Sequence, residues 1–159
     1  MNIDEEIKFP FRNDYHRGIV NLNYTVNKLT YDFFQLLRKH KLTEAQYNIL
    51  WVLHSFHSGG PVSIGFLKER MLDRSSDVSR VVEKLFEKGL VSRKENVHDR
   101  RQKDVEITSE GAGLISSMDD CVRKMDTLLQ NLSNEEVKSL NLLLDKIRSC
   151  VNCGKNQNT

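Results

Sequence analysis

The stretch from Leu67 to Gly111 constrains the fold more than any other part of the sequence. Two short helical patterns, a tight turn and a polar hairpin follow one another within it. The second helical pattern is predicted to bury Val78, Val81, Val82 and Leu85. Gly89 follows as a left-handed helix cap. Leu90–Arg93 is predicted to be a strand, and Asp104–Thr108 alternates polar and apolar residues as a returning strand does. This order predicts a helix-turn-helix followed by a β-ribbon, or wing.

A long amphipathic helix is predicted before this stretch, from about Arg12 to Lys39. Its apolar face is expected to hold Ile19, Leu22, Val26, Leu29, Phe33 and Leu36. The stripe is too long for a small domain to cover alone, so we expect part of it to be buried against a partner subunit. Residues 1–11 carry little pattern and are expected to form an extended arm.

Several helix starts can be recognised from their capping residues. Thr43 and Gln46 form one capping box, and Ser133 and Glu136 form another. One of the two residues at 108–109 is expected to cap a second long helix. The sequence is therefore rich in helices, with one ribbon in the middle and long amphipathic helices on both sides.

The predicted fold class is mainly α with a small two- to three-stranded antiparallel wing, and long N- and C-terminal helices for dimerisation. An arm and dimerisation helix are expected over residues 1–41, and a winged helix-turn-helix over 42–108. The C-terminal dimerisation helices are expected over 109–153, and a disordered tail over 154–159.

Composition gives information on the cellular compartment of the protein and on its binding partners. No run of 18 apolar residues exists in the 159, so no membrane span is expected. The N-terminus is acidic and lacks the features of a signal peptide, and the odd number of cysteines suits reduced thiols. These features predict a cytoplasmic protein. The formal net charge of +2 does not by itself indicate a nucleic-acid partner, so the distribution of charge matters.

The outer face of the second short helix is predicted to read double-stranded DNA, because such a helix fits the major groove with its N-terminal residues at the base edges. The expected contacts are Ser75, Ser76, Asp77, Ser79, Arg80 and Lys84. Arg80 is suited to a guanine or a phosphate. Asp77 would repel phosphates, so it either accepts from a cytosine amino group or orients Arg80 or Arg74.

The ribbon carries a local excess of positive charge. Residues 93–103 hold five basic residues against two acidic ones, a net +3: Arg93, Lys94, Arg100, Arg101 and Lys103 against Glu95 and Asp99. Arginines at a ribbon tip suit the minor groove, whose negative potential attracts them. A short basic hairpin alone fits a solvated loop equally well. Its place directly after a helix-turn-helix favours DNA contact.

The sequence resembles the MarR family of bacterial transcription regulators over most of residues 17–151. The resemblance is carried by Leu67–Met71, Ser75–Leu85, Glu87–Val91, Asp99-Arg100-Arg101 and the pattern from Val105 to Gly111. The flanking motifs that begin at Leu42 and Leu132 fit as well. The sequence departs from the family at Leu72-Asp73, where many members carry a glycine and a leucine.

The resemblance implies a homodimeric regulator, expected to be a repressor, that binds a palindromic operator with one winged helix on each half-site. It also implies that Arg100 or Arg101 enters the minor groove and that Asp99 braces the wing. Lys103, which belongs to the wing's positive charge, is expected to contact DNA as well. Relatives bind small phenolic or lipophilic effectors between scaffold and DNA-binding lobe. We expect Tyr47 and Trp51 to fill the core beside the helix-turn-helix, although they also suit such an effector pocket.

Other functions find less support in the sequence. No glycine-rich phosphate loop, nucleophile elbow or paired carboxylates point to an enzyme, so no catalytic residue and no cofactor is expected. His54 and His57 are interpreted as surface or packing residues, and no metal site is expected. Cys150 and Cys153 leave open a reversible disulfide and a redox-responsive regulator. A dimeric protein-interaction module with a degenerate winged helix also stays open.

Overall fold

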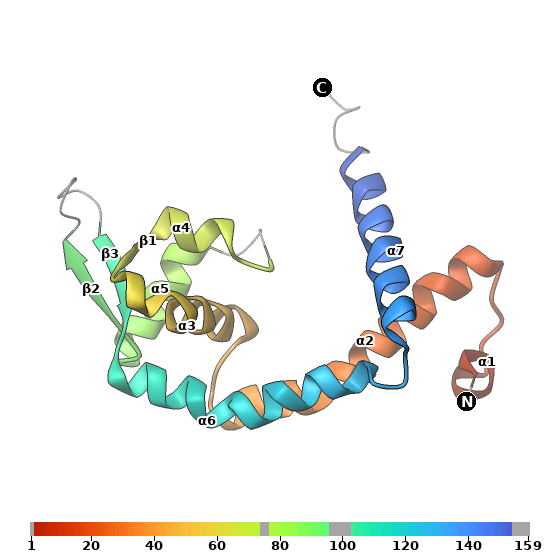
Figure 1. Cartoon of the computed structure of the whole chain (residues 1–159), viewed down its shortest axis with the longest axis horizontal. Helices are drawn as coiled ribbons and strands as arrows, with labels where there is room; N and C mark the ends of the chain where they lie inside the picture. Colours follow the sequence, from red (N-terminus) through yellow and green to blue (C-terminus); the bar gives the residue numbers. More distant parts are fainter. Residues whose placement is uncertain (1, 74–76, 96–102, 154–159) are drawn as a thin grey trace. The chain divides into compact units, whose positions relative to one another are not determined.

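The computed structural model describes residues 2–73, 77–95 and 103–153, and the disordered tail predicted at 154–159 lies outside them. The chain divides into two compact units, Met1–Val122 and Arg123–Thr159. The helices and strands of the first unit include the predicted helix-turn-helix and ribbon (Figure 1).

The first unit begins with a short helix, α1 (Ile3–Ile7), where the sequence led us to expect an extended arm. That expectation was wrong, because Asn2 and Glu5 form a capping box that starts a helix. The helix α1 is tied to the next helix by ion pairs. Arg17 lies 2.7 Å from Asp4, and Lys28 lies 2.6 Å from Glu6.

The long helix α2 (Asp14–Lys39) begins at Asn13, whose side chain accepts a hydrogen bond from the backbone N–H of His16. Its apolar stripe is buried only near its C-terminal end, at Phe33 and Leu37. Ile19 and Val26 remain 62% and 48% exposed. The amphipathic pattern is therefore confirmed as a helix, but the described residues of the first unit leave apolar side chains of its N-terminal half exposed.

The core of the first unit is formed by the helices and strands that follow α2. They are α3 (Glu44–Phe56), a 3-10 turn (His57–Gly59), β1 (Val62–Ser63), α4 (Ile64–Glu69), α5 (Val78–Glu87), β2 (Val91–Glu95) and β3 (Lys103–Ile107). The most deeply buried side chains are apolar, including Ile49, Leu50, Leu67, Val82, Leu85 and Val105. The capping box of Thr43 and Gln46 is present as predicted. Trp51, expected in the core, is 48% exposed because it lies on the outer side of α3.

The three strands form an antiparallel sheet in the order β1-β3-β2. The wing pair runs in register from Val91 opposite Ile107 to Glu95 opposite Lys103. β1 adds a short third strand through Val62 opposite Val105. The mainly helical fold with a small antiparallel wing is thus confirmed.

The helix α6 (Ser109–Asp126) begins at Thr108, whose hydroxyl accepts from the backbone N–H of Gly111 at 3.1 Å. A 3-10 turn (Thr127–Leu129) and α7 (Asn134–Cys153) follow in the second unit. The predicted capping box of Ser133 and Glu136 starts α7. Within this unit α7 leaves large apolar side chains exposed at Leu142, Leu143 and Ile147.

Candidate nucleic-acid interface

The outward face of α5 carries three of the residues predicted to contact DNA. Val78, Val82 and Leu85 turn inward and are at most 4% exposed. The exposed positions between Val78 and Leu85 are Ser79, Arg80, Glu83 and Lys84. Burial of the valine and leucine side therefore fixes which polar side chains α5 can present to a partner.

Asp77 is the N-cap of α5. Its carboxylate accepts a hydrogen bond of 3.2 Å from the backbone N–H of Arg80. This contact satisfies one of the amide groups that a helix leaves unpaired at its start, and the negative charge suits the positive end of the helix dipole. The carboxylate thus contacts the backbone of Arg80. This cap explains why an acidic residue occurs on a surface that is predicted to contact DNA.

The end of α5 leads directly into the wing. The backbone N–H of Leu90 donates to the carbonyl of Leu85 at 3.0 Å, and that of Gly89 donates to Phe86 at 2.9 Å. Gly89 has a φ of 72°, which favours glycine. This pair of hydrogen bonds closes the helix in a Schellman motif and directs the chain into β2.

Arg93 on β2 connects the wing with α5. Its guanidinium forms an ion pair with Glu83 and lies 4.7 Å from the centre of the Phe86 ring. Planar guanidinium groups stack well on aromatic faces. Sequence reasoning counted Arg93 only as part of the wing's charge. Glu83 and Arg93 lie on either side of the turn at Gly89. Their opposite charges were the signal in the sequence that could have indicated that Arg93 braces the wing against α5.

The remaining predicted DNA contacts fall where the structure gives no side-chain placement. Lys103 begins β3, but its side chain lies outside the described residues. The same holds for the whole of Ser75, Ser76, Asp99, Arg100 and Arg101. Their proposed roles therefore remain predictions.

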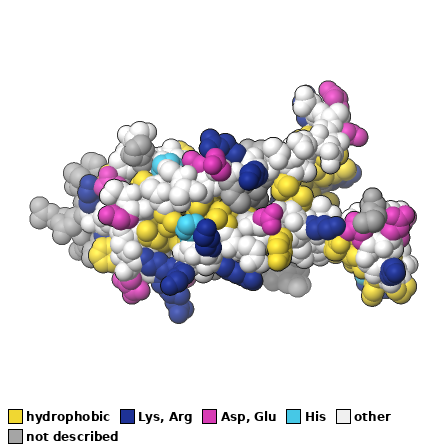
Figure 2. All heavy atoms as spheres, turned by 90° about the horizontal axis from the view of Figure 1, so that it is seen from below, with side chains coloured by type: hydrophobic (Ala, Val, Ile, Leu, Met, Phe, Trp, Pro, Cys, Tyr) yellow, Lys and Arg dark blue, Asp and Glu magenta, His cyan; other side chains and the backbone are white. Residues whose placement is uncertain are grey.

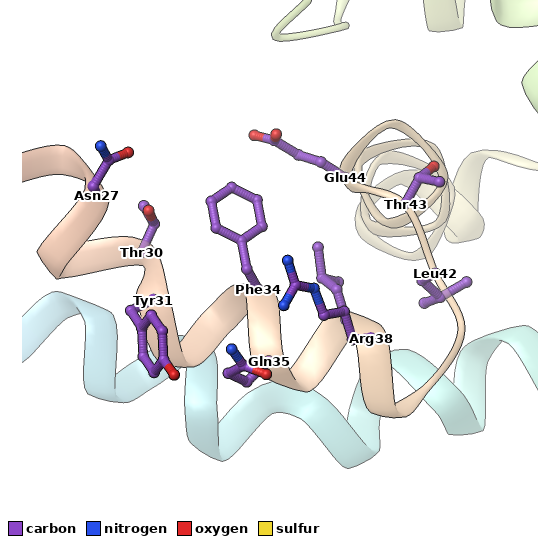
Figure 3. A pocket seen from close by; sticks show the side chains of 10 residues that line it. Asn27, Thr30, Tyr31, Phe34, Gln35, Arg38, Leu42, Thr43 and Glu44 are labelled. Carbon is purple, nitrogen blue, oxygen red and sulfur yellow. The ribbon is translucent and has the colours of Figure 1, made fainter. Parts of the chain in front are cut away.

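A cavity of about 370 Å³ lies between the end of α2 and the start of α3. Phe34 and Glu44 extend toward this space from the two helices, with Arg38 beside Phe34 (Figure 3). Tyr47 and Trp51 are not among its lining residues. Tyr47 instead packs edge-on against Phe33, with ring centres 4.9 Å apart.

Sequence reasoning did not name the residues of this cavity. Phe34 lies beside the apolar stripe of α2 rather than on it, and it is 37% exposed. An aromatic residue off the stripe, followed by Arg38 one turn later, was the available signal.

The described residues can also be searched for membrane-spanning helices and for metal sites. Within residues 2–73, 77–95 and 103–153, no helix is long and apolar enough to cross a bilayer. In the same part of the chain, His, Cys, Asp and Glu form no group of three suited to a metal.

Comparisons with known proteins agree on one family. The MarR family model matches residues 42–103. The HTH-type transcriptional regulator MhqR of Bacillus subtilis (strain 168) is 30% identical over 112 residues, which cover 70% of this chain and 75% of that protein. The HTH-type transcriptional repressor IacR of Pseudomonas putida is 27% identical over 140 residues, or 87% of this chain and 77% of that protein.

Among solved structures, the S. aureus MepR–DNA complex matches with a TM-score of 0.70 at 22% identity. The match covers 89% of this chain and 99% of that chain. At this identity the likeness shows the fold. Both sequence relatives are named as transcription regulators, which confirms the expectation that this chain is not an enzyme. The chain belongs to the MarR family of transcription regulators, DNA-binding proteins built on a winged helix-turn-helix.

Proposed function

We propose that this protein is a cytoplasmic homodimeric repressor that binds a palindromic operator. The outward face of α5, with Ser79, Arg80 and Lys84 exposed together, is the observation that carries the proposal. The helix would lie in the major groove, and the wing arginines Arg100 and Arg101 would lie in the minor groove. The name of IacR as a repressor favours this direction of regulation.

The uncovered stripe of α2 supports the homodimer. Ile19, Leu22 and Val26 are large apolar residues between 39% and 62% exposed on one helix. Exposed apolar faces of this kind mark association sites. A two-fold dimer would present two α5 helices to two half-sites, which is why a palindrome is expected.

Replacement of Arg100 and Arg101 by alanine tests the wing. We expect weaker operator binding and a shallower dependence of affinity on salt, since each lost phosphate contact lowers the salt slope by about one. Fluorescence anisotropy over a range of salt concentrations measures both quantities. The duplex is the tightest-binding sequence that the unsubstituted protein selects from a random library.

The control is Lys138→Ala with Lys146→Ala, which removes the same charge from exposed positions on α7. We expect this pair to leave the salt slope unchanged. An Arg100 and Arg101 double variant with unaltered affinity and slope removes the wing from the proposal. If the unsubstituted protein binds no duplex even at low salt, the interaction-module alternative is favoured instead.

We further propose that a small effector binds the cavity between α2 and α3 and releases DNA. An exposed aromatic ring beside Arg38 and Glu44 suits a small aromatic molecule with a polar group. The test is thermal stabilisation by a panel of small phenols and aromatic acids, compared between the unsubstituted protein and Phe34→Ala. A compound that stabilises both equally does not bind this cavity.

The redox alternative depends on Cys150 and Cys153, whose side chains lie outside the described residues. Mild peroxide followed by mass spectrometry tests it. No mass change at these two residues would remove a disulfide switch from consideration.

A further inference from the structure

A single ammonium group joins the recognition helix α5 to the turn between α2 and α3. The side-chain Nζ of Lys88 donates to the backbone carbonyl of Lys41 at 2.6 Å and to Oε1 of Gln46 at 3.1 Å. Lys88 is the C-cap of α5. The contacts connect segments 47 and 42 residues apart in the sequence.

Both acceptors are held rigidly by other interactions. Lys41 follows α2 with a φ of 53°, and the backbone N–H of Leu42 donates to the carbonyl of Leu37 at 2.9 Å. This Schellman closure fixes the carbonyl of Lys41 at the negative end of α2. Gln46 is 3% exposed, and its Oε1 also accepts from the backbone N–H of Thr43 at 3.1 Å.

The polar contact supplies what the apolar packing of α5 does not. Val82 and Leu85 bury α5 in the core, but apolar contacts are not directional and tolerate small rotations or shifts of a helix. A charged donor with two fixed acceptors has a preferred position. Lys84, on the side of α5 proposed to face DNA, lies one turn before Lys88. A displacement of α5 at Lys88 would therefore also displace Lys84.

The same turn forms a wall of the cavity described above, through Leu42 and Thr43. Thr43 is in the capping box with Gln46, and Gln46 accepts from Lys88. The wall of the cavity and the end of α5 are therefore linked through the side chain of Gln46, whose Oε1 accepts from both Thr43 and Lys88.

We propose that Lys88 is a positioning residue for DNA recognition, which sets the register of α5 against the α2–α3 turn without touching DNA. The proposal rests on the DNA-binding function proposed above. It assigns to Lys88 an effect on the discrimination between sequences rather than on phosphate attraction.

The test compares Lys88→Met, which keeps the aliphatic stem, with the conservative Lys88→Arg. The control is Lys39→Met, which removes the same charge from an exposed position near the end of α2. Binding is measured to the selected duplex and to a random duplex. For Lys88→Met we expect the ratio of these affinities to fall about tenfold, as loss of a hydrogen bond to a charged group predicts. We expect its salt slope to stay unchanged, and Lys88→Arg to restore the ratio.

A fall of the salt slope by about one with an unchanged ratio would make Lys88 a phosphate contact and overturn the proposal. Hydrogen exchange without DNA gives a second readout. In Lys88→Met the amides of residues 41–47 and 85–91 should both exchange faster, and in Lys39→Met neither should. Faster exchange in only one segment would overturn the link. Failure of the unsubstituted protein to bind any duplex would refute the proposed function, and the exchange result would still decide whether Lys88 ties the two segments.

Discussion

Gly111 shows how a single residue decides the approach of α6 to the winged helix. A Cβ at this position would lie 2.2 Å from the carbonyl oxygen of Leu90 and 2.9 Å from Cγ1 of Ile107. The backbone oxygen cannot move aside, because it accepts from the backbone N–H of Thr108 at 3.2 Å. Glycine is therefore required by space rather than by backbone conformation.

Gly111→Ala should destabilise the protein by about 1–3 kcal/mol, the usual cost of forcing an extra carbon into a packed site. Gly113 is the matched control, because a Cβ there meets nothing within 4 Å in the same helix. Gly113→Ala should stabilise by up to about 1 kcal/mol through helix propensity. Urea unfolding of the two variants measures both effects. Equal effects of the same sign would contradict the steric explanation.

Asp77 allows its capping role to be separated from a role in binding. Asp77→Ala should cost about 1 kcal/mol of stability, whereas Asp77→Asn should cost little, because asparagine also caps helices. If the carboxylate serves only as a cap, Asp77→Asn should also bind DNA more tightly, since a charge that repels phosphates is gone. Thermal melting and anisotropy give the two readouts. Loss of sequence discrimination in Asp77→Asn would instead indicate base contact.

At the scale of elements, two ion pairs connect α1 with α2. Hydrogen bonds from Lys28 and then Tyr24 lower the pKa of Glu6 below its usual 4.5. A hydrogen bond from Arg17 lowers the pKa of Asp4 below its usual 3.8. A carboxyl group whose pKa is lowered by folding stabilises the folded form above its usual pKa. That stabilisation is lost as the pH falls through the lowered pKa.

The arm formed by α1 should therefore stay docked at neutral pH and detach as the pH falls through the lowered pKa values of Glu6 and Asp4. Backbone amide resonances of residues 2–8, followed from pH 6 to pH 3, report the change. Glu6→Gln should remove the step that belongs to Glu6 and keep that of Asp4. Arm resonances that do not shift over this range would show that the ion pairs do not hold α1.

At the scale of the whole molecule, the exposed stripe of α2 predicts a dimer at micromolar concentration. Several apolar side chains are visible on the face of the molecule shown in Figure 2, interspersed with charged ones. Ile19→Glu should shift the protein toward monomer, because a carboxylate would have to be buried in the interface. Asn21→Glu puts the same charge on another side of α2 and should remain dimeric. Sedimentation equilibrium measures the masses. A monomeric unsubstituted protein would contradict the dimer.

Local patterns in the sequence were enough to predict the order of helices and strands from α2 to α7, apart from the two-residue strand β1. The capping pairs at Thr43 and Ser133 and the cap at Gly89 are short-range devices, since each satisfies backbone groups a few residues away. Periodicity likewise predicted the buried side of α5. The helix at residues 3–7 was missed although its capping box of Asn2 and Glu5 is local, whereas its ion pairs with α2 join residues that are distant in the sequence.

The sequence by itself determined the fold class, the family and the polar face of α5, because these depend on periodicity and on residues close together along the chain. Only the tertiary structure decided that Arg93 braces the wing and that Trp51 is exposed. It also revealed the cavity beside Phe34 and the contact of Lys88 with Lys41 and Gln46. These features depend on which distant segments meet, and no pattern within one helix or strand specifies that.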